Sequence, residues 1–200
     1  MPALETVKKL AETMTGWSRP NEADLADLVR ERKAHTFRFG DDGLIPNHPR
    51  WPLVLYRGAV RFPERFDPAA VLEELFEHNG WGDSWRDGIY DYVHYHSRIH
   101  EVLGIARGRA TATGRLARTQ AQLKPGDIAI LPAGTGHQCL SATNDFLVVG
   151  AYPPSGTYDE CTKRAEHERA TKSIPKVPRP RKDPVYGAKG PLLAAWPSRR

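Results

Sequence analysis

The stretch that decides the fold is HYHSRIHE, residues 94–101, which places three of the chain's eight histidines and a glutamate within eight positions. In a strand, side chains two positions apart point the same way, so His94 and His96 would share one face with Cα atoms roughly 6–7 Å apart. After a short turn, the chain is expected to return as a second strand that begins at Glu101, whose carboxylate can join the two imidazoles. His100 has the opposite parity and is expected near the mouth or on the outer face.

His137 is the candidate for a further ligand. It follows GDIAILPAGTG, residues 126–136, which is typical of a strand that ends in a Pro/Gly turn and fixes the next side chain. Three imidazoles and a carboxylate would be costly to bury without a partner, and these donors suit divalent transition metals. The sequence therefore predicts a metal site made of His94, His96, Glu101 and His137.

The surrounding chain indicates an all-β domain with one central helix. Short β-branched or aromatic segments separated by turn residues predict strands at 35–39, 51–56, 88–96, 100–108, 109–114, 127–134 and 145–152. Regular short strands of this kind favour a barrel or a sandwich. Residues 67–78 predict a helix capped by Asp67 with Pro68 just inside. The intervening NGWGDSWRDG, residues 79–88, is predicted to be a loop carrying Trp81 and Trp85.

Both ends of the chain differ from this central part. Residues 1–33 predict a helical extension, with one helix at 3–15 and another that starts near Ser18 and contains Pro20. Residues 161–200 form a Pro-rich basic arm with 11 Lys or Arg against 3 Asp or Glu, whereas residues 1–160 carry 18 against 21. We expect residues 165–172 to be helical and the arm to pack on the barrel through five apolar residues: Val185, Tyr186, Leu192, Leu193 and Trp196.

Composition limits the compartment and the partners. No apolar run is long enough for a membrane span or a secretory signal, and two cysteines do not suggest a disulfide framework. A cytoplasmic protein without a membrane partner is expected. The basic arm lacks the aromatics and motif geometry of a nucleic-acid site, so we expect a solvated surface and no nucleic-acid partner. The histidines outside the cluster, His35, His48, His78 and His167, are expected at the surface or as caps.

Two spaced motifs carry a resemblance to a known superfamily. Gly88, His94, His96, Glu101 and Gly108 follow the spacing of one motif, and Gly126, Pro132, Gly134, His137 and Ser141 follow that of a second. These resemble the two signature motifs of the cupin superfamily. The second departs only at its last position, where Ser141 replaces the usual Asn, which is a turn residue and not a ligand.

From about residue 35 to residue 196, the chain also resembles a bacterial family of small single-domain cupins, through segments such as DDGLIPNHP, PAGTGHQCL and VVGAYPP. The resemblance implies an antiparallel β-barrel or double-stranded β-helix of the jelly-roll type, here over residues 34–160. It also implies a metal held by His94, His96, Glu101 and His137 near one end of the bore, and it makes a homodimer the expected assembly.

Three functions are open at this point. Four ligands leave two positions of a six-coordinate ion free, which is typical of a catalytic metal, whether Fe, Mn, Ni, Zn, Co or Cu. The first expectation is a dioxygenase-like oxidoreductase acting on a small organic substrate. The alternatives are an isomerase, epimerase or lyase acting on a sugar or oxo-acid, and a non-catalytic cupin that binds a small ligand. Tyr90 and Tyr92 share the parity of His94, so they are expected to face the bore, either as catalytic groups or as core aromatics.

Overall fold

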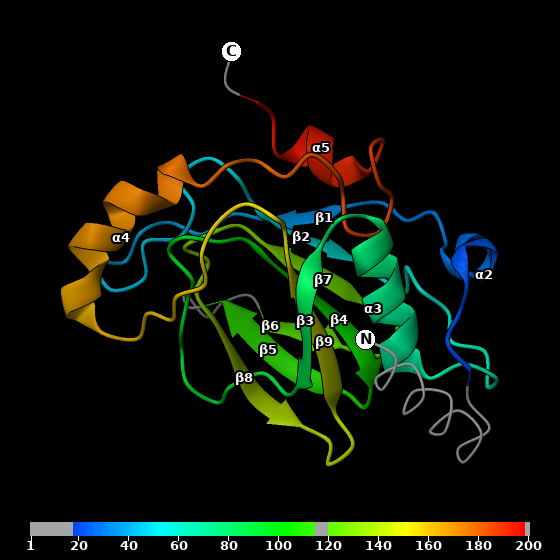
Figure 1. The fold of residues 1–200 in the computed structure, drawn as a ribbon. Helices are drawn as coiled ribbons and strands as arrows, with labels where there is room; N and C mark the ends of the chain where they lie inside the picture. Colours follow the sequence, from blue (N-terminus) through cyan, green and yellow to red (C-terminus); the bar gives the residue numbers. More distant parts are fainter. Residues whose placement is uncertain (1–17, 115–119, 199–200) are drawn as a thin grey trace, which may run out of the picture.

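Two antiparallel sheets form the body of the protein (Figure 1). The structure, a computed structural model, describes residues 18–114 and 120–198, so the helix predicted at 3–15 lies outside the described residues. The larger sheet has the order β1-β2-β7-β4-β9-β3, with β1 at His35–Phe37, β2 at Leu53–Tyr56, β3 at Gly82–Asp87, β4 at Glu101–Arg107, β7 at Ile128–Leu131 and β9 at Leu147–Tyr152. The smaller sheet has the order β6-β5-β8, with β5 at Ala110–Gly114, β6 at Gln120–Leu123 and β8 at His137–Ala142. The predicted all-β cupin fold is confirmed.

Strand parity divides the large sheet into two buried faces. Leu103, Ile105 and Val148 belong to a core cluster on the inner face, which is turned toward the small sheet. Their neighbours Val102 and Val149 belong to a larger cluster on the outer face. Because both faces are buried, these strands are apolar along almost their whole length instead of alternating. Glu101 begins β4 with inner-face parity, which places its carboxylate at one end of the interior.

A helix and the C-terminal arm cover the outer face. Helix α3, Pro68–His78, begins at its Asp67 cap as predicted and turns Leu72 and Phe76 toward the sheet. Helix α2, Glu22–Leu28, begins after an Asn21 cap that accepts the backbone N–H of Asp24. Pro20 therefore precedes the helix, and its predicted place inside the helix is wrong.

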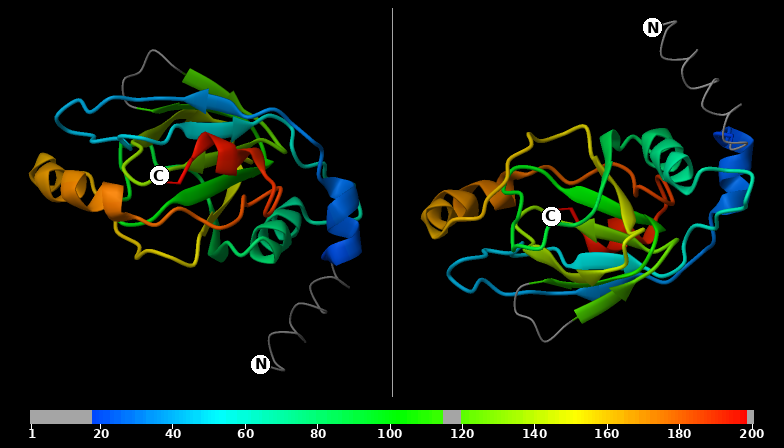
Figure 2. Two further views of the ribbon diagram at one scale, coloured as in Figure 1. Left: turned by 90° about the horizontal axis from the view of Figure 1, so that it is seen from above. Right: turned by 90° about the horizontal axis from the view of Figure 1, so that it is seen from below.

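The C-terminal arm is part of the core. Its elements are η1 at Arg164–Glu166, α4 at His167–Ser173, η2 at Ile174–Lys176 and α5 at Pro191–Ala195, and the view from above shows α5 lying over the strands (Figure 2). Leu192 and Trp196 are fully buried, and the Trp196 indole stacks on Trp51 and donates to the Pro52 carbonyl. Of the five apolar residues predicted to hold the arm, Val185, Leu192 and Trp196 lie in the outer-face core cluster and Tyr186 packs against it. The division into domains at 33/34 and 160/161 stays a prediction.

The region around residues 79–96 differs from the prediction. The predicted loop at 79–88 contains β3, an edge strand that pairs with β9 although its side chains are mainly polar and largely exposed. Residues 88–93, predicted as strand, are irregular. The segment contacts β8 through the bridge between His94 and His137 and through the Tyr90 carbonyl, which accepts the N–H of Cys139. Strands β6 and β8 were not predicted: β6 alternates polar and apolar residues over only four positions, and β8 is mainly polar.

Candidate metal centre

Three separate segments bring the predicted ligands together. Buried His94, His96 and His137 each offer a ring nitrogen, and these nitrogens lie within 4.8 Å of one another. Glu101 adds its Oε2, which lies 3.4 Å from Nε2 of His96 and 3.5 Å from Nε2 of His137. All four predicted side chains thus converge at one end of the interior, and the three buried histidines form a cluster that could bind a metal ion.

Backbone pairing fixes the positions of these side chains. His94 and His137 form a reciprocal bridge, each N–H donating to the other's carbonyl at 3.2 and 3.0 Å. The His96 carbonyl accepts the N–H of Gly134, in the Pro/Gly turn that leads into β8. Gly134 has a φ of +88°, and a Cβ there would lie 2.5 Å from the Ile174 side chain. Residue 134 therefore has to be glycine. The hydrogen bond from its N–H to the His96 carbonyl links the turn before β8 to the segment that carries His94 and His96.

The hydrogen bonds of the imidazoles set their tautomers. Nδ1 of His94, His96 and His137 faces the backbone carbonyls of Tyr92, Asp159 and Thr135, respectively. A carbonyl oxygen can only accept, so each Nδ1 carries a proton. The neutral form of each ring therefore has its lone pair on Nε2, which is the arrangement of histidines that bind metals.

Electrostatics in the metal-free cluster centre on His96 and Glu101. Burial lowers the pKa of His137 to about 3, and the neighbouring His94 adds to this effect. Burial and the charge of His96 also lower the pKa of His94. Burial opposes a charged His96, but the Glu101 carboxylate outweighs it and raises the pKa of His96 to about 9. Burial likewise opposes ionised Glu101, yet His96 holds the pKa of that carboxyl below its usual value. One proton thus sits where a cation would bind.

A cavity of about 280 Å³ adjoins the cluster. Its walls include Trp85, Tyr152 and Tyr158, and the four predicted ligands line one side. Buried Tyr152 accepts a 2.8 Å hydrogen bond from Nε1 of Trp85, and the Tyr158 ring lies 5.0 Å from that of His96. The arrangement provides room for a small molecule beside the histidines, between aromatic walls.

The predicted tyrosines do not face the bore as strand residues. Tyr90 lines the cavity but is 46% exposed, and Tyr92 is 42% exposed and donates to Glu160. The parity argument fails here because residues 88–93 are not a strand. The rings of Tyr90 and Tyr92 instead stack on each other, 4.8 Å apart. Tyr90 thus reaches the cavity from an irregular segment, whereas Tyr92 is not among the residues that line it, and a catalytic role for either stays a prediction.

His100 lies on the outer face, which is one of its two predicted places, and it is not part of the histidine cluster. It is fully buried on the outer face beneath the C-terminal arm, where its ring contacts Trp196 and Nε2 donates to the Pro178 carbonyl. His48, expected at the surface or as a cap, is a buried cap whose Nδ1 accepts the N–H groups of Arg50 and Trp51.

Two supporting residues escape the sequence reasoning. Tyr152 has the inner-face parity of Val148 and Gly150 in β9, so the same parity rule that predicts His94 and His96 would have found it. Asp159 follows β9 in a segment without regular structure, and no sequence pattern indicates it. Its carboxylate accepts the N–H groups of Ser97 and Arg98 while its carbonyl faces His96, which ties the turn after His96 to this segment.

Comparison with known proteins places the chain in a family. No family model matches the chain. A Bacillus subtilis protein, "Uncharacterized protein YjlB", is 40% identical over 168 residues, which cover 83% of this chain and 98% of that protein. The chain belongs to the YjlB family. Because this relative is itself described as uncharacterized, its similarity to the chain indicates no activity.

Solved structures similar to this chain include double-stranded β-helix and cupin-like proteins. A conserved Klebsiella pneumoniae protein with a double-stranded β-helix domain is 17% identical, covering 72% of this chain and 96% of that one, with a TM-score of 0.31. A cupin-like protein from Thermotoga maritima is 12% identical, covering 78% and 94%, with a TM-score of 0.27. Scores this low support no conclusion about chemistry. The cupin fold of this YjlB relative rests on its own two sheets, with both motifs meeting at their end.

Proposed function

We propose that this chain is an enzyme that holds one divalent transition metal ion between His94, His96, His137 and Glu101 and acts on a small organic molecule. The observation that supports this most strongly is the buried Oε2 of Glu101, which makes no hydrogen bond and has as its polar neighbours Nε2 of His96 and Nε2 of His137, at 3.4 and 3.5 Å. A buried carboxylate oxygen without a partner is costly. A cation between it and the Nε2 atoms of His96 and His137 would remove that cost.

The donor set fits such an ion. Three neutral imidazoles and one carboxylate are ligands that Fe, Mn, Ni, Co, Zn and Cu all accept. An ion bound there would supply Lewis-acid or redox chemistry at coordination positions that the protein leaves free. The chain itself would bind the substrate in the 280 Å³ cavity and exclude water from it with the rings of Trp85, Tyr152 and Tyr158.

For the reaction, we favour a dioxygenase-like oxidation. A cavity beside the free positions would admit a small organic substrate together with dioxygen. The test is oxygen uptake by Fe(II)-loaded protein across a panel of small catechols, enediols and 2-oxo acids, with His96→Ala as the inactive variant. Exposed His35, outside the cluster, gives the control His35→Ala. Uptake that needs iron and substrate and is lost only in His96→Ala supports the oxidation.

A non-oxidative isomerase, epimerase or lyase is the second candidate, because buried Tyr152 places a hydroxyl proton beside the cavity. This reaction would proceed without oxygen and with Zn(II) or Mn(II), on a sugar or oxo-acid. Turnover of such a substrate under argon would show that the reaction needs no oxygen and would contradict the dioxygenase-like oxidation. Tight binding of a small ligand without turnover in either assay would leave a ligand-binding cupin.

A further inference from the structure

We propose that Tyr152, held by Trp85, is a positioning residue that orients the Glu101 carboxylate toward His96 and His137. This inference rests on the metal site of the proposed function and adds a requirement that neither cupin motif contains. Tyr152 acts through Glu101, so its contribution is to the geometry of the site.

Strand register places Tyr152 beside Glu101. Strands β4 and β9 pair Leu103 with Gly150 and Val102 with Ala151. One step further along the same antiparallel register, Glu101 stands opposite Tyr152, with both side chains on the inner face. Side chains directly opposite in such a pair have Cβ atoms about 4.5–5.5 Å apart. Both residues line the same cavity.

Trp85 fixes the tyrosine ring. Its indole lies directly on Gly150, where a Cβ would come within 2.1 Å of the ring, and its Nε1 donates to the Tyr152 hydroxyl oxygen at 2.8 Å. Because an indole N–H is only a donor, the hydroxyl proton must find a different acceptor. Glu101 is the neighbouring acceptor, because the strand register sets it opposite Tyr152 and both side chains line the same cavity.

The proposal assigns one oxygen of the Glu101 carboxylate to each side. Oε2 of Glu101 has no hydrogen bond and faces His96 and His137. The Tyr152 hydroxyl would therefore donate to the other oxygen, Oε1, and hold the carboxylate with Oε2 directed at the histidines. Groups that orient a ligand in this way typically contribute 10–100-fold to metal affinity.

The test is a titration of metal-free protein with Co(II), read by the visible absorption of the bound ion and by competition with a chelator. Tyr152→Phe removes only the hydroxyl. Its matched control is Tyr158→Phe, because Tyr158 lines the same cavity but directs its hydroxyl to Glu160. Trp85→Phe is a second variant, which keeps the Tyr152 hydroxyl but removes the indole N–H that donates to it.

We expect the Kd for Co(II) to rise about 10–100-fold in Tyr152→Phe, with a changed Co(II) spectrum, and to rise less in Trp85→Phe. Tyr158→Phe should stay within about twofold of the natural protein. Urea unfolding of the metal-free proteins checks that the variants fold. If Tyr152→Phe does not fold, the comparison is made with Trp85→Phe.

Two failures are distinguishable. If the natural protein binds Co(II) and neither Tyr152→Phe nor Trp85→Phe changes its affinity or spectrum, the positioning role is wrong while the metal site stands. If the natural protein binds no Co(II), the proposed function is wrong and the positioning role falls with it.

Discussion

At the scale of single residues, Gly150 supports the wall of the cavity. Strand β9 passes under Trp85 at this position, and any Cβ would collide with the indole. Gly150→Ala should therefore displace Trp85, lower the free energy of unfolding by about 1–3 kcal/mol and weaken metal binding. Urea unfolding and Co(II) titration measure both effects. Gly82→Ala in β3, where no atom lies within 4 Å of the added Cβ, is the control, and equal behaviour of the two variants would contradict the prediction.

His48 makes stability depend on pH. Burial, with the charges of Arg50 and Arg38, lowers its pKa to about 4, whereas an unfolded histidine titrates near 6.5. Between these values the unfolded chain binds more protons, so stability falls as the pH is lowered through this window. His48→Asn keeps an acceptor for the two backbone N–H groups but does not titrate.

We therefore expect His48→Asn to be less stable than the natural protein at pH 7.5, and the difference to shrink by about 1–2 kcal/mol at pH 5. Urea unfolding of both metal-free proteins at the two pH values gives the comparison. A difference that does not change with pH would show that His48 is not held neutral in the folded protein.

The residues that converge at the candidate metal centre could be predicted from the sequence, because the spacing of His94, His96, Glu101 and His137 is itself the signal. The directions of Tyr90 and Tyr92 could not be predicted by parity, because parity applies only inside a strand and residues 88–93 are irregular; Tyr90 lines the cavity and Tyr92 does not. Asp159 could not be found at all, since its contacts with Ser97 and Arg98 join segments about 60 positions apart.

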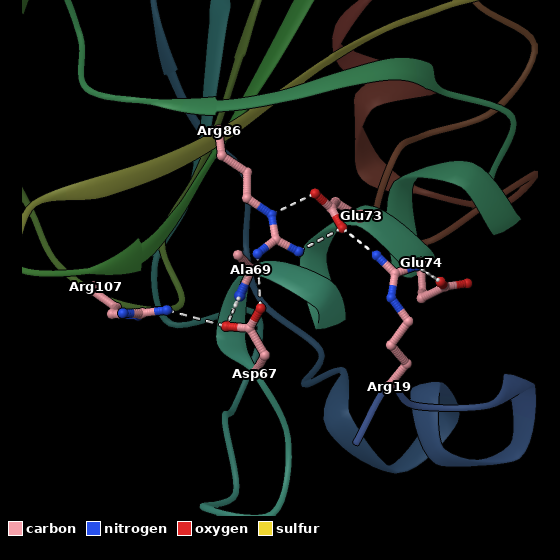
Figure 3. A network of polar contacts seen from close by, with 7 residues as sticks. All are labelled: Arg19, Asp67, Ala69, Glu73, Glu74, Arg86 and Arg107. Atoms are coloured by element: carbon pink, nitrogen blue, oxygen red, sulfur yellow. Dashed lines mark hydrogen bonds and ion pairs between the residues drawn. The ribbon is translucent and has the colours of Figure 1, made fainter. Parts of the chain in front are cut away.

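At the scale of elements, an ion-pair network anchors α3 to the sheet (Figure 3). The Asp67 cap accepts the N–H of Ala69 at 3.3 Å and also contacts Arg86 of β3 and Arg107 of β4. Arg86 in turn pairs with Glu73, which also contacts Arg19. One carboxylate thus begins the helix and joins it to two strands.

Asp67→Ala should lower the free energy of unfolding by about 1–2 kcal/mol, since it removes the cap together with both ion pairs. Asp67→Asn keeps a capping oxygen and should lose less than half as much, because partly exposed ion pairs contribute little. Urea unfolding separates the two variants. An equal loss in both would mean that the charge, and not the cap, stabilises α3.

Helix α3 was predictable because cap, proline and apolar spacing agree over residues 67–78. Strand β3 was not, because its polar sequence resembles a loop and only the exposed edge of β9 makes it a strand. The local sequence pattern determines helix α3, whereas pairing with β9 determines strand β3.

At the scale of the molecule, the C-terminal arm completes the core on the outer face of the large sheet. Trp196→Ala would remove a fully buried indole that packs on Trp51, and we expect a loss of about 3–5 kcal/mol in the free energy of unfolding. Exposed Arg181 in the same arm gives the control Arg181→Ala, expected within about 0.5 kcal/mol of the natural protein. A small effect of Trp196→Ala would show that the arm is dispensable.

The proposed function requires that the three histidines and Glu101 hold a metal ion. The most direct measurement is the metal content of protein purified without chelator or affinity nickel, by inductively coupled plasma mass spectrometry. The Glu101→Ala/His137→Ala double variant is measured alongside. We expect close to one transition-metal ion per chain in the natural protein and almost none in the variant. A natural protein that stays metal-free even after reconstitution, or equal metal in both proteins, would contradict the proposed function.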